Sequence, residues 1–233
     1  MKHDKPLNSE ILFWAGLALA VGSFGVVLTS IFYALSPVSA ALPVPGVSIA
    51  EAQQGMLSGR ITMIAAGIVG VPSDVILIAS TLLLMVFRMP ASLQIERLGL
   101  ALVTMGVVIF TFVDALAAGV LTQIAAFDST MTVFAGFKFL FDILFIFGTI
   151  TIGLGAPMVF ISELKATSSI LSRPLAWAGT LFSLLGLISS ILYFVHIPLP
   201  QLIGISIAGV SLIFGIYGIQ IARQSNSSLK EIK

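Results

Sequence analysis

The sequence predicts an all-α protein, a polytopic transmembrane bundle of six helices with both ends of the chain in the cytoplasm. Three observations lead to this fold class. Of the 233 residues, 58% are hydrophobic and only 9% are charged, long apolar stretches recur along the chain, and positive charge gathers in alternate connections. Soluble domains are about 45–50% apolar and about 25% charged. A soluble enzyme, a nucleic-acid-binding module and a coiled coil are therefore excluded.

The apolar stretches define six candidate spans in one integral membrane domain, residues 1–233. A spanning helix needs about 20 mostly apolar residues, and such windows cover residues 11–34, 61–88, 98–124, 131–161, 174–196 and 201–222. Val38-Ser39-Ala40 resembles a signal-peptidase site. Because the first window is far longer than a signal-peptide core of about 7–15 residues, we expect a retained first span, with cleavage as the alternative.

The connections are short except for residues 35–60, a segment rich in Pro, Gly and Ala that we expect to form an external loop. Within it, Ser48–Gly59 is compatible with a short surface helix of weak amphipathicity. The short connections elsewhere predict that consecutive helices are antiparallel neighbours. The external loop is thus the one long segment that we expect outside the bundle.

The distribution of Lys and Arg predicts the orientation. Nine of these residues fall in the two tails and in the second and fourth connections, and Arg60 alone falls on the other side. By the positive-inside rule both termini are cytoplasmic and the protein lies in a cytoplasmic membrane. The nine are Lys2, Lys5, Arg88, Arg97, Lys165, Arg173, Arg223, Lys230 and Lys233. We expect Trp14 and Trp177 to anchor inner helix ends, and Tyr33 and Tyr193 outer ends.

Small and polar residues recur at helical spacing along the first, fifth and sixth spans. In lipid, helices associate through close approach at such residues, so we interpret these stripes as packing seams, with a pore lining as the alternative. The stripes are Gly16, Ala20, Ser23 and Ser30; Gly179, Ser183, Gly186 and Ser190; and Gly204, Ala208, Ser211, Gly215 and Gly218.

Four ionisable residues fall inside the second, third and fourth spans: Asp74, Asp114, Lys138 and Asp142. A rise of about 1.5 Å per residue places the three aspartates near the membrane midplane. A charge there costs about 2.5–3.5 kcal/mol on insertion scales. We therefore expect one polar cluster between these three spans, facing the bundle interior.

Lys138 and Asp142 are spaced i, i+4 and can pair on one helix face. The other two carboxyls then lack a full counter-charge, so we predict that at least one aspartate is protonated near neutral pH or is wetted by a cavity. The cluster is interpreted either as a proton or small-solute pathway or as structural pairing.

Two prolines fall inside spans, in Gly70-Val71-Pro72-Ser73-Asp74 and in Gly153-Leu154-Gly155-Ala156-Pro157. Gly70, Pro72, Gly155 and Pro157 are therefore candidate helix breaks. Broken helices at a midplane site are typical of transporters, and a plain proline kink is the alternative. The fifth span has no internal proline, which disfavours an inverted repeat.

The motifs of common membrane enzymes and metal sites are absent from the sequence. It has no cysteine and only two histidines, and we find no nucleophile–base set, phosphate loop or metal-ligand spacing. We therefore predict no catalytic residue, no metal and no cofactor. Glu163 and Lys165 are expected to lie in a solvated turn.

Two segments carry a resemblance. The run from Asp74 to Arg88, DVILIASTLLLMVFR, resembles the second helix of small bacterial six-helix membrane proteins of unknown function. The run from Leu171 to Gly179, LSRPLAWAG, is similar to their fifth helix. The resemblance implies a bacterial cytoplasmic-membrane protein and assigns no catalytic residue.

Two functions follow from these observations. The first is movement of a proton or small solute through the polar cluster, with the lipid bilayer as the surroundings. The second is a noncatalytic structural, assembly or sensory subunit whose charges pair within the bundle, with a partner membrane protein or with another copy of the chain. A lipid enzyme is a third alternative that lacks a constellation of reacting groups, and no nucleic-acid partner is expected.

Overall fold

The computed structural model describes residues 4–87, 94–166, 169–197 and 199–230, and these residues are predominantly helical, with no strand among them. Six stretches are long and apolar enough to cross a membrane, which confirms the predicted fold class and number of spans. The long helices are α1 (Asp4–Leu35), α4 (Arg60–Phe87), α5 (Gln94–Ala115), α7 (Thr132–Lys165), α8 (Arg173–Phe194) and α9 (Pro200–Lys230). The third span continues from α5 through a π-helix, η1 (Leu116–Leu121), into α6 (Thr122–Phe127).

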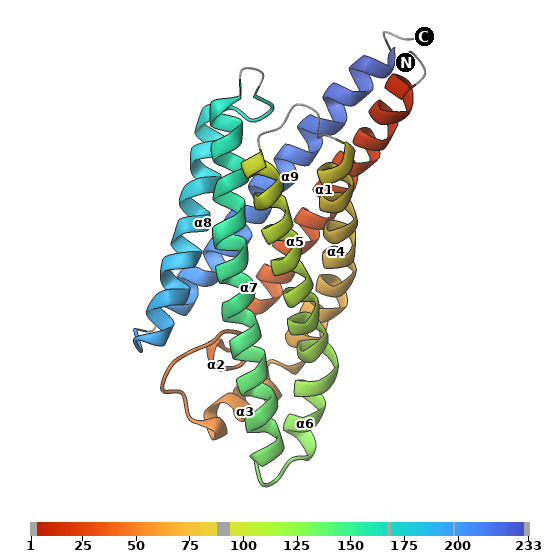
Figure 1. Ribbon diagram of the computed structural model, residues 1–233. Coiled ribbons are helices and arrows are strands. Elements are labelled where there is room, and N and C mark those ends of the chain that lie inside the picture. The colour runs from red at the N-terminus through yellow and green to blue at the C-terminus, as the bar shows by residue number, and fades with distance from the viewer. Residues whose placement is uncertain (1–3, 88–93, 167–168, 198, 231–233) are drawn as a thin grey trace.

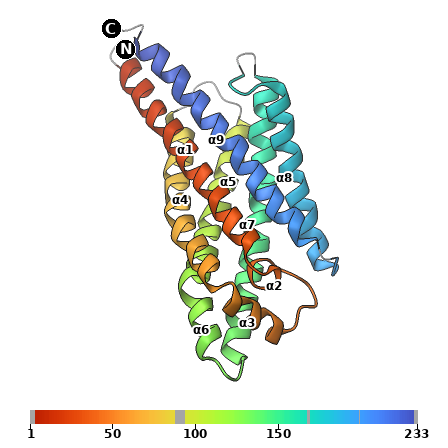
Figure 2. The ribbon, with the colours of Figure 1, turned by 180° about the vertical axis from the view of Figure 1, so that it is seen from behind.

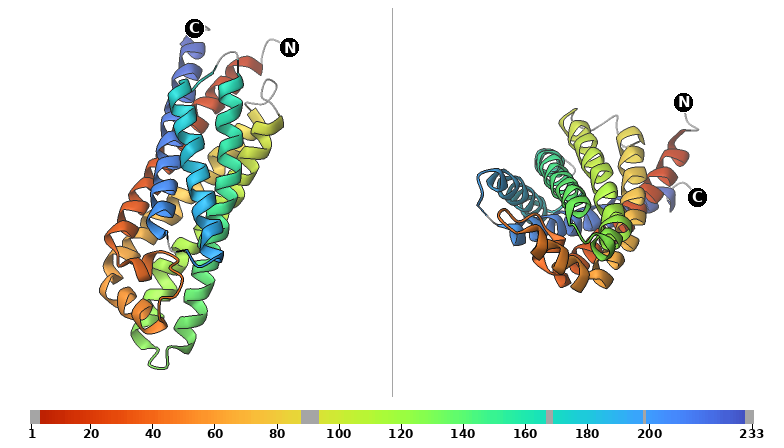
Figure 3. Two further views of the ribbon diagram at one scale, coloured as in Figure 1. Left: turned by 90° about the vertical axis from the view of Figure 1, so that its left-hand side faces the viewer. Right: turned by 90° about the horizontal axis from the view of Figure 1, so that it is seen from below.

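The six long stretches contact one another in a closed ring: α1 packs on α4, α4 on α5, α5 on α7, α7 on α8, α8 on α9, and α9 on α1. Helices α4, α5, α7 and α8 lie in one row, and α1 and α9 cross that row diagonally (Figures 1 and 3). Both termini lie at one end of the bundle, which we call the terminal end, and α2, α3 and α6 lie at the opposite, far end (Figure 1). An even number of spans produces this arrangement.

The outer surface of the bundle is apolar. Trp14 is 57% exposed, Phe112 61% and Trp177 56%, although a soluble protein would bury such side chains. These faces suit contact with lipid tails. The side of the membrane on which the termini lie stays a prediction, and Lys2, Arg88 and Lys233, on which it partly rests, lie outside the described residues.

Glycines allow the helices to approach closely, as the small-residue stripes predict. A Cβ placed at Gly16 of α1 would lie 2.7 Å from the carbonyl oxygen of Gly218 in α9, and a Cβ at Gly155 of α7 would lie 2.6 Å from that of Gly99 in α5. Gly204 differs, because a Cβ there would meet no atom within 4 Å. The interpretation as a packing seam is therefore confirmed at Gly16 and Gly218. At Gly204 it is not, because no neighbouring helix lies against that position.

Helices α4 and α7 continue through Pro72 and Pro157 without interruption, so the broken helices typical of transporters are not present at these positions, and the alternative of a proline within a continuous helix agrees with the structure. A proline inside a helix removes one backbone hydrogen bond, and neighbouring helices can hold the flanking turns in place. Gly70 and Gly155 serve close packing: a Cβ at Gly70 would lie 1.7 Å from the Asp114 carboxyl oxygen Oδ2. The one irregular segment among the described spans is η1, which the sequence pattern did not predict.

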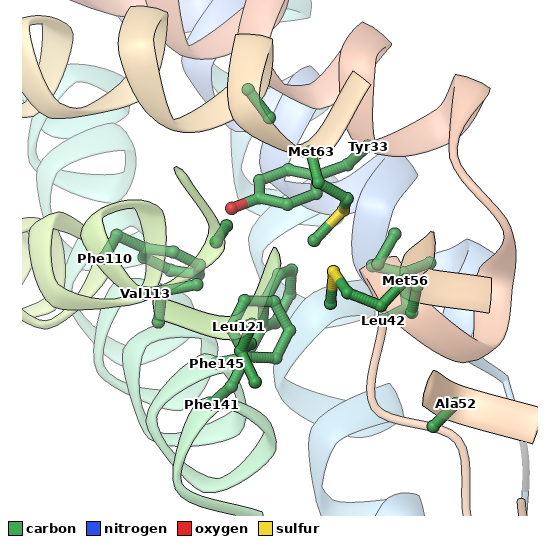
Figure 4. Packing of buried hydrophobic residues seen from close by; sticks show 14 of the residues in the cluster. Tyr33, Leu42, Ala52, Met56, Met63, Phe110, Val113, Leu121, Phe141 and Phe145 are labelled. Atoms are coloured by element: carbon green, nitrogen blue, oxygen red, sulfur yellow. The ribbon is translucent and has the colours of Figure 1, made fainter. Parts of the chain in front are cut away.

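Residues 35–60 fold back onto the far end of the bundle as two short helices, α2 (Val38–Ala41) and α3 (Ile49–Ser58). The Ser48 hydroxyl accepts a bond from the Glu51 amide and caps α3, which confirms the predicted short helix. Ala40 and Met56 are fully buried, and Met56 lies among Leu42, Met63 and Tyr33 (Figure 4). The segment is thus a packed cap and not a free loop.

The turn before α7 is held by Asp128. Its carboxylate accepts bonds from the backbone amides of Phe134, at 2.8 Å, and Thr130, at 3.2 Å. The Phe134 amide bond and the Thr130 hydroxyl bond lower the pKa of Asp128 below its ordinary value. The half-buried carboxylate therefore caps the start of α7 in its charged form.

Candidate functional site

The four predicted ionisable residues lie on spanning helices and are buried, but they form two pairs instead of one cluster. Asp74, Asp114 and Lys138 are each at most 3% exposed, and the Asp142 side chain is 16% exposed. Asp74 and Asp114 interact across α4 and α5. Lys138 and Asp142 interact along α7. Among the described residues, no hydrogen bond or ion pair joins one pair to the other.

Asp114 is held by a tyrosine from a third helix. The hydroxyl of Tyr33 in α1 donates to Asp114 Oδ1 at 2.6 Å, and the tyrosine ring is buried beside Met63 and Phe145 (Figure 4). Tyr33 is only 7% exposed, so its predicted role as an outer aromatic anchor is wrong. The reason is that a buried phenol needs an acceptor, and Asp114 supplies one.

Glycines of α4 make room for Asp114. In addition to Gly70, a Cβ at Gly67 would lie 2.3 Å from the Asp114 carbonyl oxygen. Asp114 lies two residues before η1, and π-helical turns are frequently found at functional sites. The local packing of α4 against α5 and η1 therefore places this carboxyl group at a fixed position inside the bundle.

Asp74 lies near the middle of α4 and is incompletely paired. The Thr111 side chain of α5 is a neighbour of its carboxyl group, but one carboxyl oxygen, Oδ2, is buried and has no hydrogen-bond partner among the described residues. The charge of Asp114 acts on Asp74 as well. Two neighbouring buried carboxyl groups, one of them with a free oxygen, form an unusual arrangement in a membrane interior.

A cavity of about 360 Å³ extends to both carboxyl groups. Its walls come from α1, α2, α4, α5, α7 and α9, and they are mostly apolar. Thr29, Ser30 and Ser211 are polar residues among these walls, and Gly204 and Ala208 of the sixth-span stripe also line the cavity. Part of the predicted packing stripe therefore borders open space, as the alternative of a pore lining predicts for those positions.

The second pair, Lys138 and Asp142, is closed in the sense that its two opposite charges compensate each other within α7. Lys138 donates a short hydrogen bond to Asp142, which confirms the predicted i, i+4 pair, and its ammonium group lies 5.3 Å from the centre of the Phe141 ring. Phe141 contacts Phe145, and Phe145 contacts Tyr33. This chain of aromatic rings separates the Lys138–Asp142 pair from the Tyr33–Asp114 pair.

A third set of buried polar groups at the terminal end was missed by sequence reasoning. The hydroxyl of Tyr217 in α9 lies 2.9 Å from Glu163 Oε1 of α7 and 3.3 Å from Glu96 Oε1 of α5. Glu163 Oε2 accepts the backbone amides of Ile170, at 2.7 Å, and Leu171, at 3.2 Å. Glu163 is 1% exposed, so the predicted solvated turn is wrong. The helix continues past residue 161 and carries Glu163 into the bundle.

The positions of Tyr33 and Tyr217 in the sequence suggest that both need hydrogen-bond acceptors inside the bundle. A buried tyrosine hydroxyl usually has a hydrogen-bond partner, and Tyr33 and Tyr217 lie in spans, as does Tyr193 at the end of the fifth. Buried carboxyl groups are the strongest available acceptors. Pairing each span tyrosine with a span carboxyl would have suggested these contacts, although not which helices meet.

The described residues contain no group of three or more His, Asp or Glu side chains that could hold a metal ion. The chemistry that the site offers is proton exchange and electrostatic attraction of a cation, through Asp74 and Asp114. Comparisons with protein-family models, with curated proteins and with solved structures found no match to this chain.

Proposed function

We propose that this multi-pass membrane protein moves a proton or a small solute through the bundle, using Asp74 and Asp114 as the exchanging groups. The observation that carries the proposal is the cavity of about 360 Å³ that reaches both carboxyl groups while Asp74 Oδ2 stays unpartnered. A purely structural pair would be expected to fill its hydrogen bonds and exclude open space.

The surroundings of Asp74 suit a group that gains and loses a proton. The neighbouring Thr111 donates its hydroxyl proton to the carbonyl of Val107 at 3.0 Å. Asp74 Oδ2 is left without a hydrogen-bond partner among the described residues. A proton can therefore bind at Oδ2 without the loss of an existing hydrogen bond there, and the carboxyl group lies beside the cavity in either state.

The proposal includes the surroundings that the charge distribution predicts: a cytoplasmic membrane, with both termini on the cytoplasmic side. It includes no enzymatic activity. The alternative, a noncatalytic membrane subunit, is favoured by one observation, the closed Lys138–Asp142 pair. That pair has its charges compensated within one helix and needs no solute.

A proton-flux assay tests the proposal. Purified protein in liposomes that enclose a pH-sensitive dye is given a pH gradient and a potassium–valinomycin potential. We expect the wild type to carry protons above the rate of protein-free liposomes. Asp74→Asn and Asp114→Asn should lower the protein-dependent rate about tenfold or more, because a carboxamide has no dissociable proton at these pH values.

The matched control removes the other pair. The double variant Lys138→Met/Asp142→Leu deletes both charges together, which proteins often tolerate without loss of stability, and it should keep the wild-type flux within about twofold. Absence of flux in the wild type, or equal flux in the wild type and both asparagine variants, would contradict the proposal and favour the structural subunit.

A further inference from the structure

We propose that the cavity binds an amphiphilic organic cation, an apolar molecule with a quaternary or protonated amine, that enters sideways from the lipid between α1 and α9. This inference rests on the proposed function, because it names the class of solute that would use the same site. It is carried by the juxtaposition of three features: two buried carboxyl groups, three aromatic side chains that line the same cavity, and an opening on the lipid-facing surface.

The sign of the charge follows from the cavity walls. Asp74 and Asp114 are the charged residues that line it, and no Lys, Arg or His of the described chain does. The aromatic residues Tyr33, Phe110 and Phe145 line the same space. The face of an aromatic ring attracts a cation, and aromatic cages of this kind recognise quaternary ammonium groups. An anion would meet only repulsion there.

The apolar lining selects an organic cation over a small inorganic one. An ion such as Na⁺ or K⁺ must exchange its hydration shell for several oxygen ligands, and the cavity walls are mostly aliphatic and aromatic. A quaternary ammonium carries its charge beneath methyl groups and fits an apolar surface. The volume of about 360 Å³ falls within the range of about 300–1,000 Å³ typical of small-molecule sites.

The route of entry follows from the arrangement of α1 and α9. The two helices touch at Gly16 and Gly218 near the terminal end, and they separate toward the far end, where α1 leads to α2 and α9 leads to α8 (Figure 2). In that region Ile31 of α1 and Ile205 of α9 line the cavity and are also 49% and 52% exposed. The cavity therefore reaches the apolar outer surface between these helices.

Small residues keep this passage open. Gly204 and Ala208 lie on the α9 side of the cavity, and a Cβ at Gly204 would meet no atom within 4 Å. A larger side chain at Gly204 can therefore be accommodated without overlap with the protein and would occupy the passage itself. This property gives a variant that blocks the site without touching either carboxyl group.

The test is saturation binding of tritiated benzyltrimethylammonium to the purified full chain in nonionic detergent, by scintillation proximity. Neopentylbenzene, in which a tert-butyl carbon replaces the nitrogen, is the uncharged isostere. We expect saturable binding that unlabelled benzyltrimethylammonium displaces and neopentylbenzene displaces at least about tenfold less well, since the loss of a desolvated charge–charge contact costs a factor of that size or more.

Two variants locate the binding. Gly204→Leu should lower the affinity at least about tenfold, and Gly136→Leu, a matched glycine on α7 that also has no neighbour within 4 Å of its Cβ position, should bind as the wild type does. Asp74→Asn should weaken binding of the cation more than that of the isostere. Because Gly204→Leu leaves the carboxyl pair intact, its result stands even if the aspartate variant fails to fold.

The possible outcomes distinguish failure of the cation-binding inference from failure of the proposed proton movement. Proton flux without saturable cation binding, or equal displacement by the cation and its neutral isostere, overturns the inference and leaves the proton pathway standing. Binding that Gly204→Leu does not weaken overturns the lateral route. Cation binding of the expected pattern without any proton flux supports the binding site and contradicts proton movement.

Discussion

Two regions of this protein contain the same types of buried side chain, but they differ in how fully the carboxyl groups are hydrogen-bonded. In each, a tyrosine of the first or last long helix donates to a buried carboxyl group that has a second one nearby. Tyr33 donates to Asp114, with Asp74 beside the same cavity, and Tyr217 donates to Glu163, with Glu96 Oε1 at 3.3 Å. At the terminal end, both carboxyl oxygens of Glu163 accept hydrogen bonds, Oε2 from two backbone amides and Oε1 from the Tyr217 hydroxyl. Near the middle of α4, Asp74 Oδ2 has no hydrogen-bond partner among the described residues, and a cavity borders the Asp74–Asp114 pair.

The difference distinguishes a buried carboxyl group that stabilises the fold through its hydrogen bonds from one that can still bind a proton or a ligand. A carboxyl group that accepts two backbone amides and a phenol fixes the segment that supplies them, here the approach to α8. A carboxyl group with a free oxygen beside open space contributes little to stability and costs free energy to bury. We interpret the first region as structural and the second as functional.

The largest expected difference between the two regions is in the free energy of unfolding. Glu163→Ala removes the acceptor of the Ile170 and Leu171 amides and of the Tyr217 hydroxyl, so it should lower the unfolding free energy by about 3 kcal/mol or more. Asp74→Ala removes a poorly paired group next to an existing cavity, and it should change stability by less than about 1 kcal/mol. Unfolding by sodium dodecyl sulfate in mixed micelles, followed by circular dichroism, measures both.

Equal losses of unfolding free energy in Glu163→Ala and Asp74→Ala would contradict the distinction between a structural and a functional region. A loss at Asp74→Ala as large as that at Glu163→Ala would mean that Asp74 also holds the fold together. The proposed function would then lose its main support.

The helix pattern could be predicted from the sequence because spanning length and apolar composition are local properties. The six spans and the Ser48-capped helix required no knowledge of which helices meet. The i, i+4 pair of Lys138 and Asp142 was also predictable, since both partners lie on one helix face.

The candidate site could be predicted only in part. Asp74 and Asp114 stand out as charges in apolar spans, but their partner Tyr33 is 81 positions away from Asp114. The cavity depends on the divergence of α1 and α9, which small-residue stripes do not encode, because the same residues can pack a seam or border a space. The sequence predicts a solvated position for Glu163 because the apolar window of the fourth span ends at residue 161.

Within the functional region, we expect a smaller difference in stability between two glycine substitutions, one at a packed position and one beside the cavity. Gly70→Ala places a methyl group where the Asp114 carboxyl now lies, and it should lower the unfolding free energy by about 1–3 kcal/mol. The matched Gly204→Ala adds a methyl group to open space in a helix, and it should leave stability unchanged or raise it by up to about 1 kcal/mol. The same titration distinguishes them. Similar losses in both would mean that the cavity beside Gly204 is not open.

The most direct test of the central claim is the reactivity of the buried carboxyl groups toward dicyclohexylcarbodiimide, an apolar reagent that enters from the membrane and adds to a protonated carboxyl group. The protein in liposomes is treated, digested and analysed by mass spectrometry, with detergent-unfolded protein at acidic pH as the control in which the carboxyl groups are protonated and react. We predict an adduct at Asp74 or Asp114 and none at Glu96 or Glu163. Labelling of Glu163 to the same extent, or no labelling of Asp74 and Asp114, would contradict the assignment of the cavity-lined pair as the functional site.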